Sequence, residues 1–133
     1  MTVIHDKPTI EKDGWVLESA DERAAAAPDM FSIPTLMRRQ SLQTGEAARL
    51  LFDIVTRSNG KVVDRGTDRM WVLVKSAEAG RYIGVLDNEP GASDNLNLHL
   101  GDLVAFGPEH ICEVGSPPRE YVVQKYGDAF FKN

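Results

Sequence analysis

The residues that could bind a soft metal ion or supply a nucleophile are two of the three histidines and the single cysteine. His99, His110 and Cys112 lie close together in the sequence, and an extended chain would place His110 and Cys112 on one face. A structural zinc site takes four such ligands, and three at most are present here. A cysteine–histidine nucleophile needs hydrogen-bond contact, which residues two apart rarely reach. We therefore predict a buried thiol beside a histidine at a strand end, with no metal site and no cofactor.

Carboxylate and amide side chains gather in segment 87–97, and their oxygens are the ligands that a hard cation prefers. The members are Asp87, Asn88, Glu89, Asp94, Asn95 and Asn97. Their spacing does not fit a calcium-binding loop, which needs a bidentate glutamate at a fixed distance. Aspartate and asparagine are also the common residues of turns, so we predict a turn whose geometry Asp87 and Asn88 fix.

Trp71 and Asp102 are two further candidates. Tryptophan is enriched in binding hot spots, although a tryptophan in a strand more often anchors a core. Asp102 stands at the start of a strand, where its carboxylate is expected to accept hydrogen bonds from backbone N–H groups. No residue is assigned a catalytic role, and the candidate binding residues are Trp71, Asp87, Asn88, Asp102 and His110.

The sequence lacks the motifs of several common enzyme classes. It contains no G-x-S-x-G elbow, no G-x-x-x-x-G-K-[ST] loop, no G-x-G-x-x-G and no H-E-x-x-H. An enzyme is therefore less expected than a binding protein. The enzymatic or small-molecule alternative requires four polar side chains to converge at one rim of a β-barrel, namely Asp87, Asp102, Glu109 and His110.

A series of strands from about Arg49 to Ile111 must position these residues. Alternating apolar residues predict strands at 48–54, 70–75, 81–86 and 103–106. The Asn59-Gly60 pair is a strong hairpin signal, because both residues tolerate positive φ angles. The first of these segments also fits a helical period, so a helix remains the alternative there.

The strand at 70–75 is apolar on both faces, so it must be covered on two sides by barrel closure or by a docked helix. A polar turn through 76–80 then returns the chain as the next strand. Gly84 in the middle of that strand predicts a bulge or a close approach by a neighbour such as the Trp71 ring.

Short helices are expected before and after this series. Ser19 is a suitable N-cap for a helix that Pro28 ends. A helical turn beginning near Pro34 is expected to direct its apolar residues Ile33, Leu36 and Met37 toward the core and Arg38 and Arg39 outward. Ser116 as cap and Pro117 as first helical residue predict a C-terminal helix at about 117–126. Residues 1–13 are polar and mixed in charge, and we expect a frayed start.

Length and composition fit one domain spanning 1–133, with 42% hydrophobic and 26% charged residues. The predicted fold class is α+β: a small antiparallel sheet of about five strands, strongly bent or barrel-like, with one or two packed helices. The N-terminal residues lack the apolar run of a signal peptide, and no stretch is long enough for a membrane span. We therefore expect a cytoplasmic protein and no membrane partner, and the oligomeric state stays open.

The net charge of −5 bears on the partner. An acidic surface repels nucleic acid unless its basic residues form one patch, here Arg38, Arg39, Arg49 and Lys61. Nucleic acid is therefore an unfavoured partner. A basic protein surface is the more natural one.

Three segments, RMWVLV, GVLDNEP and GDLVAFGPEHI, carry a resemblance. Together with the preceding IPTLMRRQ and GEAARLLF they resemble a bacterial family of domains of unknown function over about residues 31–111. The resemblance implies a strand at 48–54 and brings no activity, cofactor or catalytic residue. Some small bacterial proteins of this type are similar to immunity or accessory proteins. The hypothesis we favour is a non-enzymatic binding module that recognises another protein.

Overall fold

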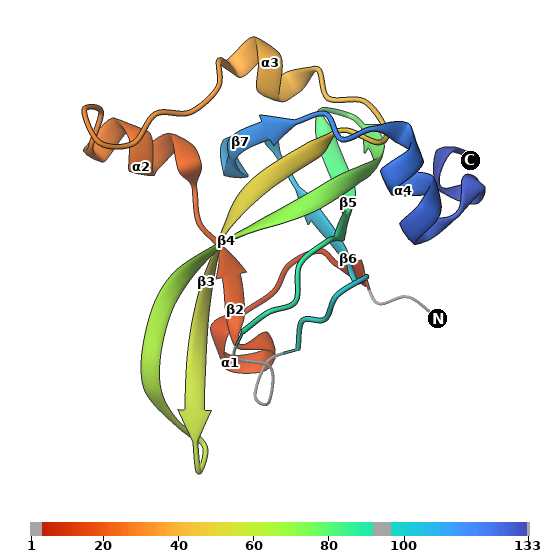
Figure 1. Cartoon of the computed structure of the whole chain (residues 1–133). Helices are drawn as coiled ribbons and strands as arrows, with labels where there is room; N and C mark the ends of the chain where they lie inside the picture. The colour runs from red at the N-terminus through yellow and green to blue at the C-terminus, as the bar shows by residue number, and fades with distance from the viewer. Residues whose placement is uncertain (1–3, 92–96, 133) are drawn as a thin grey trace.

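The computed structural model describes residues 4–91 and 97–132, which form a strongly curled sheet with short helices around it (Figure 1). The strands are β1 (Ile4–His5), β2 (Trp15–Leu17), β3 (Ala47–Ser58), β4 (Lys61–Glu78), β5 (Arg81–Leu86), β6 (Leu103–Phe106) and β7 (Ile111–Gly115). The α-helices are α1 (Ile10–Asp13), α2 (Ala20–Ala26), α3 (Leu36–Gln40) and α4 (Arg119–Tyr126), and the 3-10 helices include η2 (Pro108–His110) and η3 (Asp128–Phe131).

The sheet confirms the predicted α+β class with a strongly bent sheet. Within the described ranges it has seven strands in the order β1-β6-β5-β4-β3-β2, and β7 pairs with β3 beside β2. Two details differ from the prediction of about five antiparallel strands. Three strands lie outside the predicted series or at its end, and β1 runs parallel to β6. The strand β1 has only two residues, too few for an alternating pattern to reveal, whereas the short strand expected at 14–17 is present as β2.

Two tight hairpins build the centre of the sheet. Asn59 and Gly60 have φ angles of 53° and 79°, so the hairpin predicted at this pair is confirmed, and segment 48–54 is a strand. Ala79 and Gly80 repeat this geometry with φ angles of 53° and 77°. The second turn is therefore shorter than the predicted 76–80, because β4 continues to Glu78.

The tip of the first hairpin projects from the sheet, at the lower left of Figure 1. We call residues 56–64 the hairpin arm. In the described part of the chain no third strand pairs with it, since β2 ends its pairing at Ile54 and β5 begins its pairing at Val72. A register shift beside Thr56 leaves one extra residue, Val63, on the β4 side.

The core lies inside the curl, and a second apolar cluster lies outside it. Met70, Val72 and Val74 point inward and belong to the main core. Leu73 faces outward and packs with Val122 of α4. The prediction that the strand is covered on both sides is confirmed. Gly84 does mark a close approach, but not by Trp71: a Cβ there would lie 3.1 Å from atoms of three neighbours, Val72, Leu73 and Phe106.

The prediction of a frayed start is wrong for residues 4–13. Strand β1 pairs with β6, and α1 follows with Thr9 as its N-cap. His5 is buried, and its Nε2 lies 2.9 Å from Oδ2 of Asp102, so a long-range polar contact holds this segment.

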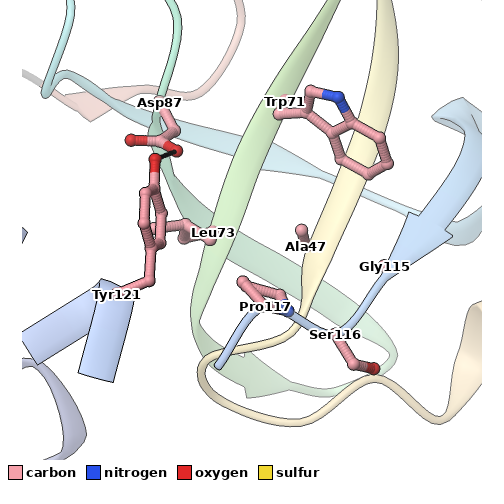
Figure 2. Close-up of a pocket in the computed structure, with 8 residues that line it drawn as sticks. All are labelled: Ala47, Trp71, Leu73, Asp87, Gly115, Ser116, Pro117 and Tyr121. Carbon is pink, nitrogen blue, oxygen red and sulfur yellow. Dashed lines mark hydrogen bonds between the residues drawn. The ribbon is translucent and has the colours of Figure 1, made fainter. Parts of the chain in front are cut away.

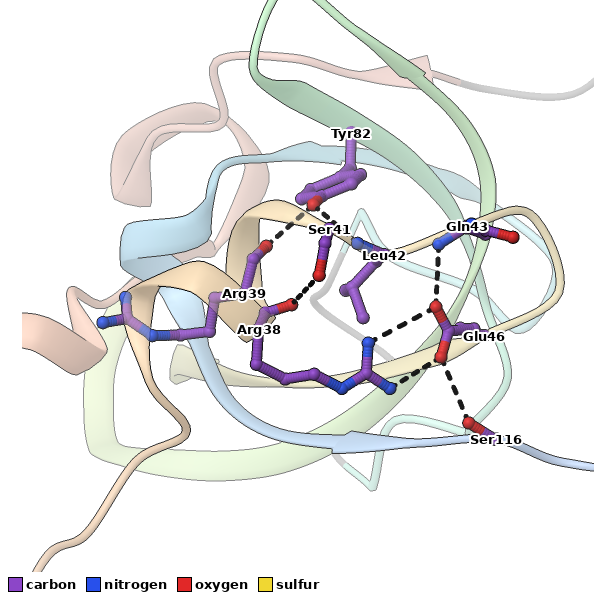
Figure 3. Close-up of polar contacts among 8 residues, drawn as sticks. All are labelled: Arg38, Arg39, Ser41, Leu42, Gln43, Glu46, Tyr82 and Ser116. Atoms are coloured by element: carbon purple, nitrogen blue, oxygen red, sulfur yellow. Dashed lines mark hydrogen bonds and ion pairs between the residues drawn. The ribbon is translucent and has the colours of Figure 1, made fainter.

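The predicted orientation of the segment after Pro34 is wrong for three of its residues. Ser19 caps α2 as expected, but α3 exposes Leu36 and Met37 and buries Arg39. The Arg39 guanidinium donates to the backbone oxygens of Pro34 and Pro108, each at 2.9 Å. The Arg39 carbonyl accepts from Tyr82 Oη at 2.7 Å (Figure 3). These bonds satisfy a charge that would otherwise have to stay in water.

The C-terminal helix is confirmed, but its predicted cap is not. Pro118 occupies the N-cap position of α4, without a side-chain cap. Ser116 instead donates to Oε2 of Glu46 at 3.1 Å, and the same carboxylate binds Arg38 (Figure 3). These contacts tie the approach to α4 to the start of β3.

Candidate functional site

A hollow of about 300 Å³ lies between the outer face of the sheet and helix α4 (Figure 2). We call it the Trp71 pocket. Its walls are mostly apolar, and they come from β3, β4, the segment after β5, β7, the loop after β7, and α4. The lining residues are Ala47, Trp71, Leu73, Asp87, Gly115, Ser116, Pro117 and Tyr121.

Trp71 is half-buried on the outer face of the sheet and does not belong to the core inside the curl. Its six-membered ring points toward Gly115, where a Cβ would lie 3.5 Å from ring atoms. The Arg49 guanidinium stacks over the ring at 5.6 Å from the centroid. A tryptophan with one side open to a hollow is placed for contact with a ligand.

Asp87 and Asn88 hold the backbone of Trp71. The Asp87 N–H donates to the Trp71 carbonyl at 2.9 Å, and Asn88 Oδ1 accepts from the Trp71 N–H at 2.5 Å. These bonds hold Asp87 and Asn88 against Trp71, just beyond the last β5 residue that pairs with β4, Leu86. Because residues 92–96 of the turn lie outside the described residues, the role of Asp87 and Asn88 in its geometry stays a prediction.

The Asp87 carboxylate fastens α4 to the sheet. Tyr121 Oη donates to Oδ2 at 2.7 Å, Tyr126 Oη donates to Oδ1 at 2.5 Å, and Lys125 Nζ lies 2.7 Å from Oδ1. Burial opposes ionisation, but the three donors outweigh it and hold the pKa of Asp87 below its usual value. Burial and the neighbouring carboxylate raise the pKa of Tyr126, which keeps this phenol a donor.

This arrangement predicts an acid-dependent loss of stability that Asp87→Asn should remove. Because the folded-state pKa lies below the unfolded value of about 3.9, Asp87 contributes fully above that value and progressively less as the pH falls through the folded pKa. We expect the free energy of unfolding of the wild type to exceed that of Asp87→Asn by a constant amount at about pH 5 to 7, and the gap to narrow below about pH 4.

Urea denaturation at a series of pH values measures this gap. The Asp29→Asn variant controls for the loss of one negative charge at an exposed position. A gap between the wild type and Asp87→Asn that stays constant down to about pH 2 would contradict the role given to the ionised carboxylate.

Lys75 holds the far end of the C-terminal segment. Its ammonium donates to the backbone oxygens of Ala129, Phe130 and Lys132, and it lies 5.0 Å from the Phe130 ring centroid. Together with Asp87, this lysine places the α4 wall of the Trp71 pocket against the sheet.

The structure brings together three of the predicted binding residues, Trp71, Asp87 and Asn88. Asp102 lies elsewhere: its carboxylate accepts from the His99 N–H at 3.0 Å, which confirms the predicted backbone contact, and it also contacts His5. His110 lies at a third place, in η2, where its Nδ1 accepts a hydrogen bond from the Gly107 N–H at 3.0 Å.

The rim required by the enzymatic alternative does not form among the described residues. Asp87 faces α4, and Glu109 pairs with Arg81 near η2. The Asp102 carboxylate instead faces His5 and His99. The Trp71 pocket is lined by Asp87 alone of the four proposed side chains, and three further hollows of the described chain are lined by none of them. Asp94 and Asn95 of the acidic segment lie outside the described residues.

Cys112 is a buried thiol, as predicted, but His110 belongs to the 3-10 helix η2 and not to the extended chain that would place the two side chains on one face. Its Sγ donates to the Arg49 carbonyl at 3.2 Å, and burial raises its pKa. No group of three or more His, Cys, Asp or Glu side chains in ranges 4–91 and 97–132 is arranged to hold a metal ion. In the same ranges, none of the helices has the length and apolar character of a membrane span.

Sequence reasoning missed the second wall of the pocket. The sequence pattern predicts only a C-terminal helix for Pro117 and Tyr121, and no local pattern indicates that Gly115 lines a pocket. The sequence did contain one indication of this wall. The strand face that carries Trp71 and Leu73 is apolar and must be covered, and the predicted C-terminal helix is a candidate to cover it.

Comparison of the chain with protein-family models, curated proteins and solved structures found no match. The resemblance to a family of domains of unknown function therefore stays a prediction, and the Trp71 pocket must be interpreted from its own chemistry.

Proposed function

We propose that this protein is a non-enzymatic, cytoplasmic binding module of the immunity or accessory type, which recognises another protein through the Trp71 pocket. The observation that carries the proposal is a half-buried tryptophan beside a mostly apolar hollow. Aromatic side chains in partly desolvated pockets are typical centres of protein recognition. A hollow of about 300 Å³ suits one side chain of a partner better than a whole cofactor.

The polar groups of the pocket support binding rather than catalysis. Asp87 is the only carboxylate among the lining residues, and three donors already occupy it. Ser116 is held by Glu46. A general acid, a base or a nucleophile would need a free reactive group. The net charge of −5 favours a basic surface around the bound side chain.

Selection of phage-displayed peptides on the full chain tests this proposal. Gly115→Met is the blocking variant, since a side chain there starts in ordinary contact with Trp71 and Ala47 and extends into the pocket. Gly66→Met is the matched control, because its Cβ meets nothing within 4 Å. We expect selected peptides to bind the wild type and Gly66→Met equally and Gly115→Met at least about tenfold more weakly.

Two results would overturn the proposal. One is that no peptide is enriched on the wild-type chain. The other is that the enriched peptides bind Gly115→Met as tightly as the wild type, when urea denaturation shows that both variants are folded.

A further inference from the structure

The indole N–H of Trp71 is a hydrogen-bond donor without a partner in the described part of the chain. The polar contacts of this residue involve its backbone, and its ring contacts the Arg49 guanidinium. The Nε1 atom is not buried, so solvent reaches it. By contrast, the indole of Trp15 is bound to the Asn97 carbonyl at 3.0 Å.

The charges around the pocket disfavour a charged ligand group. Arg49 already stacks on the Trp71 ring, and Lys125 Nζ lies 5.6 Å from the centroid of Tyr121. A second cation would be repelled by the first at either ring. The anionic Asp87 and the apolar walls disfavour a carboxylate or phosphate. The group that enters the pocket is therefore neutral and apolar.

The position of the free N–H indicates the shape of the ligand. The six-membered ring of Trp71 points toward Gly115 at the pocket, and the nitrogen lies on the edge that faces away from Ala47 and Pro117 in Figure 2. A ligand that fills the pocket and also reaches this donor must cross the indole. An extended peptide can do so, with one apolar side chain in the pocket and a backbone carbonyl at Nε1.

We propose that the Trp71 pocket binds an extended, proline-containing segment of the partner, an inference that rests on the proposed function. Proline has no backbone N–H, so it covers an apolar wall without leaving a donor unpaired. Its ring packs flat on Trp71, Tyr121 and Pro117. Its polyproline II conformation exposes carbonyl acceptors and loses little entropy on binding to aromatic-lined grooves.

Titration of the ¹⁵N-labelled full chain with two peptides tests this inference. Both peptides end in the same pair of lysines, and they contain about eight prolines or about eight alanines. The readouts are the indole N–H resonances of Trp71 and Trp15, assigned with the Trp71→Phe variant. We expect the proline peptide to shift the Trp71 resonance, to leave the buried Trp15 unchanged, and to bind at least about tenfold more tightly than the alanine peptide.

The glycine variants separate the two proposals. Gly115→Met should abolish the shift of the Trp71 resonance, and Gly66→Met should retain it. If the proline peptide causes no shift at millimolar concentration, or if the alanine peptide binds equally well, the proline inference is wrong. If phage selection still yields proline-free peptides that Gly115→Met rejects, the binding-module proposal stands without it. If both experiments fail, both proposals fall.

Discussion

Replacing Arg39 with alanine should lower the free energy of unfolding by about 2–3 kcal/mol. The Arg39 side chain is 6% exposed, and its guanidinium joins three segments through the Pro34 carbonyl, the Pro108 carbonyl and Asp21 at 3.0 Å. The truncation removes the donor from both carbonyls and opens a gap between α2, α3 and η2. Urea denaturation followed by circular dichroism measures the loss, provided that the m-value is unchanged.

The adjacent arginine is the matched control for this prediction. Arg38 is 37% exposed and pairs with Glu46 at 2.6 Å, and such a solvated pair contributes about 0–1 kcal/mol. The Arg38→Ala variant should therefore lose far less stability than Arg39→Ala. Equal losses for the two variants would show that burial of Arg39 does not hold these segments together.

The His5→Ala variant should lose about 2 kcal/mol of stability. The His5 side chain is 4% exposed, bonds to Asp102 at 2.9 Å, and packs edge-on against Trp15 at 5.2 Å between ring centroids. Its removal leaves the buried Asp102 carboxylate with one donor fewer and frees β1 from β6. The free energy of unfolding and the near-ultraviolet circular dichroism of the buried Trp15 report the change.

His99 provides a second histidine at the same carboxylate as a control. Its ring lies 3.6 Å from Asp102 Oδ2 and is 62% exposed, while its backbone N–H makes the hydrogen bond. His99→Ala keeps that N–H, so its effect should stay within about 0.5 kcal/mol. A loss for His5→Ala that is equally small would contradict the view that the buried contact with Asp102 holds β1.

Local patterns predicted the elements whose partners are near in sequence. The Asn59-Gly60 turn and the alternation along β3 and β4 depend on residues within a few positions of each other. The structure of residues 4–13 could not be found in this way, because His5 meets Asp102 97 positions later. Residue type alone predicts that the arginines of α3 face solvent. Arg39 is buried instead, because its guanidinium binds a backbone carbonyl that lies 69 positions away in the sequence.

The candidate site divides in the same way. Trp71, Asp87 and Asn88 are separate candidates in the sequence, yet the pairing of Val72 with Leu86 brings them together once the second hairpin has formed. That pairing follows from the two predicted strands. The wall containing Pro117 and Tyr121 depends on where α4 docks, which Lys75 and Asp87 fix through distant contacts.

The hairpin arm gives the molecule two regions of different hydrogen-exchange behaviour. In the described chain the strand pairing of residues 56–64 is only with each other, and most of them are exposed. They can open and close without disturbing the curl of the sheet, so their amide protons should exchange through local fraying. The amides of Ala48 and Leu50, between β4 and β7, can exchange only when the sheet itself comes apart. One continuous strand, β3, therefore contains both fast-exchanging and slow-exchanging ladder amides.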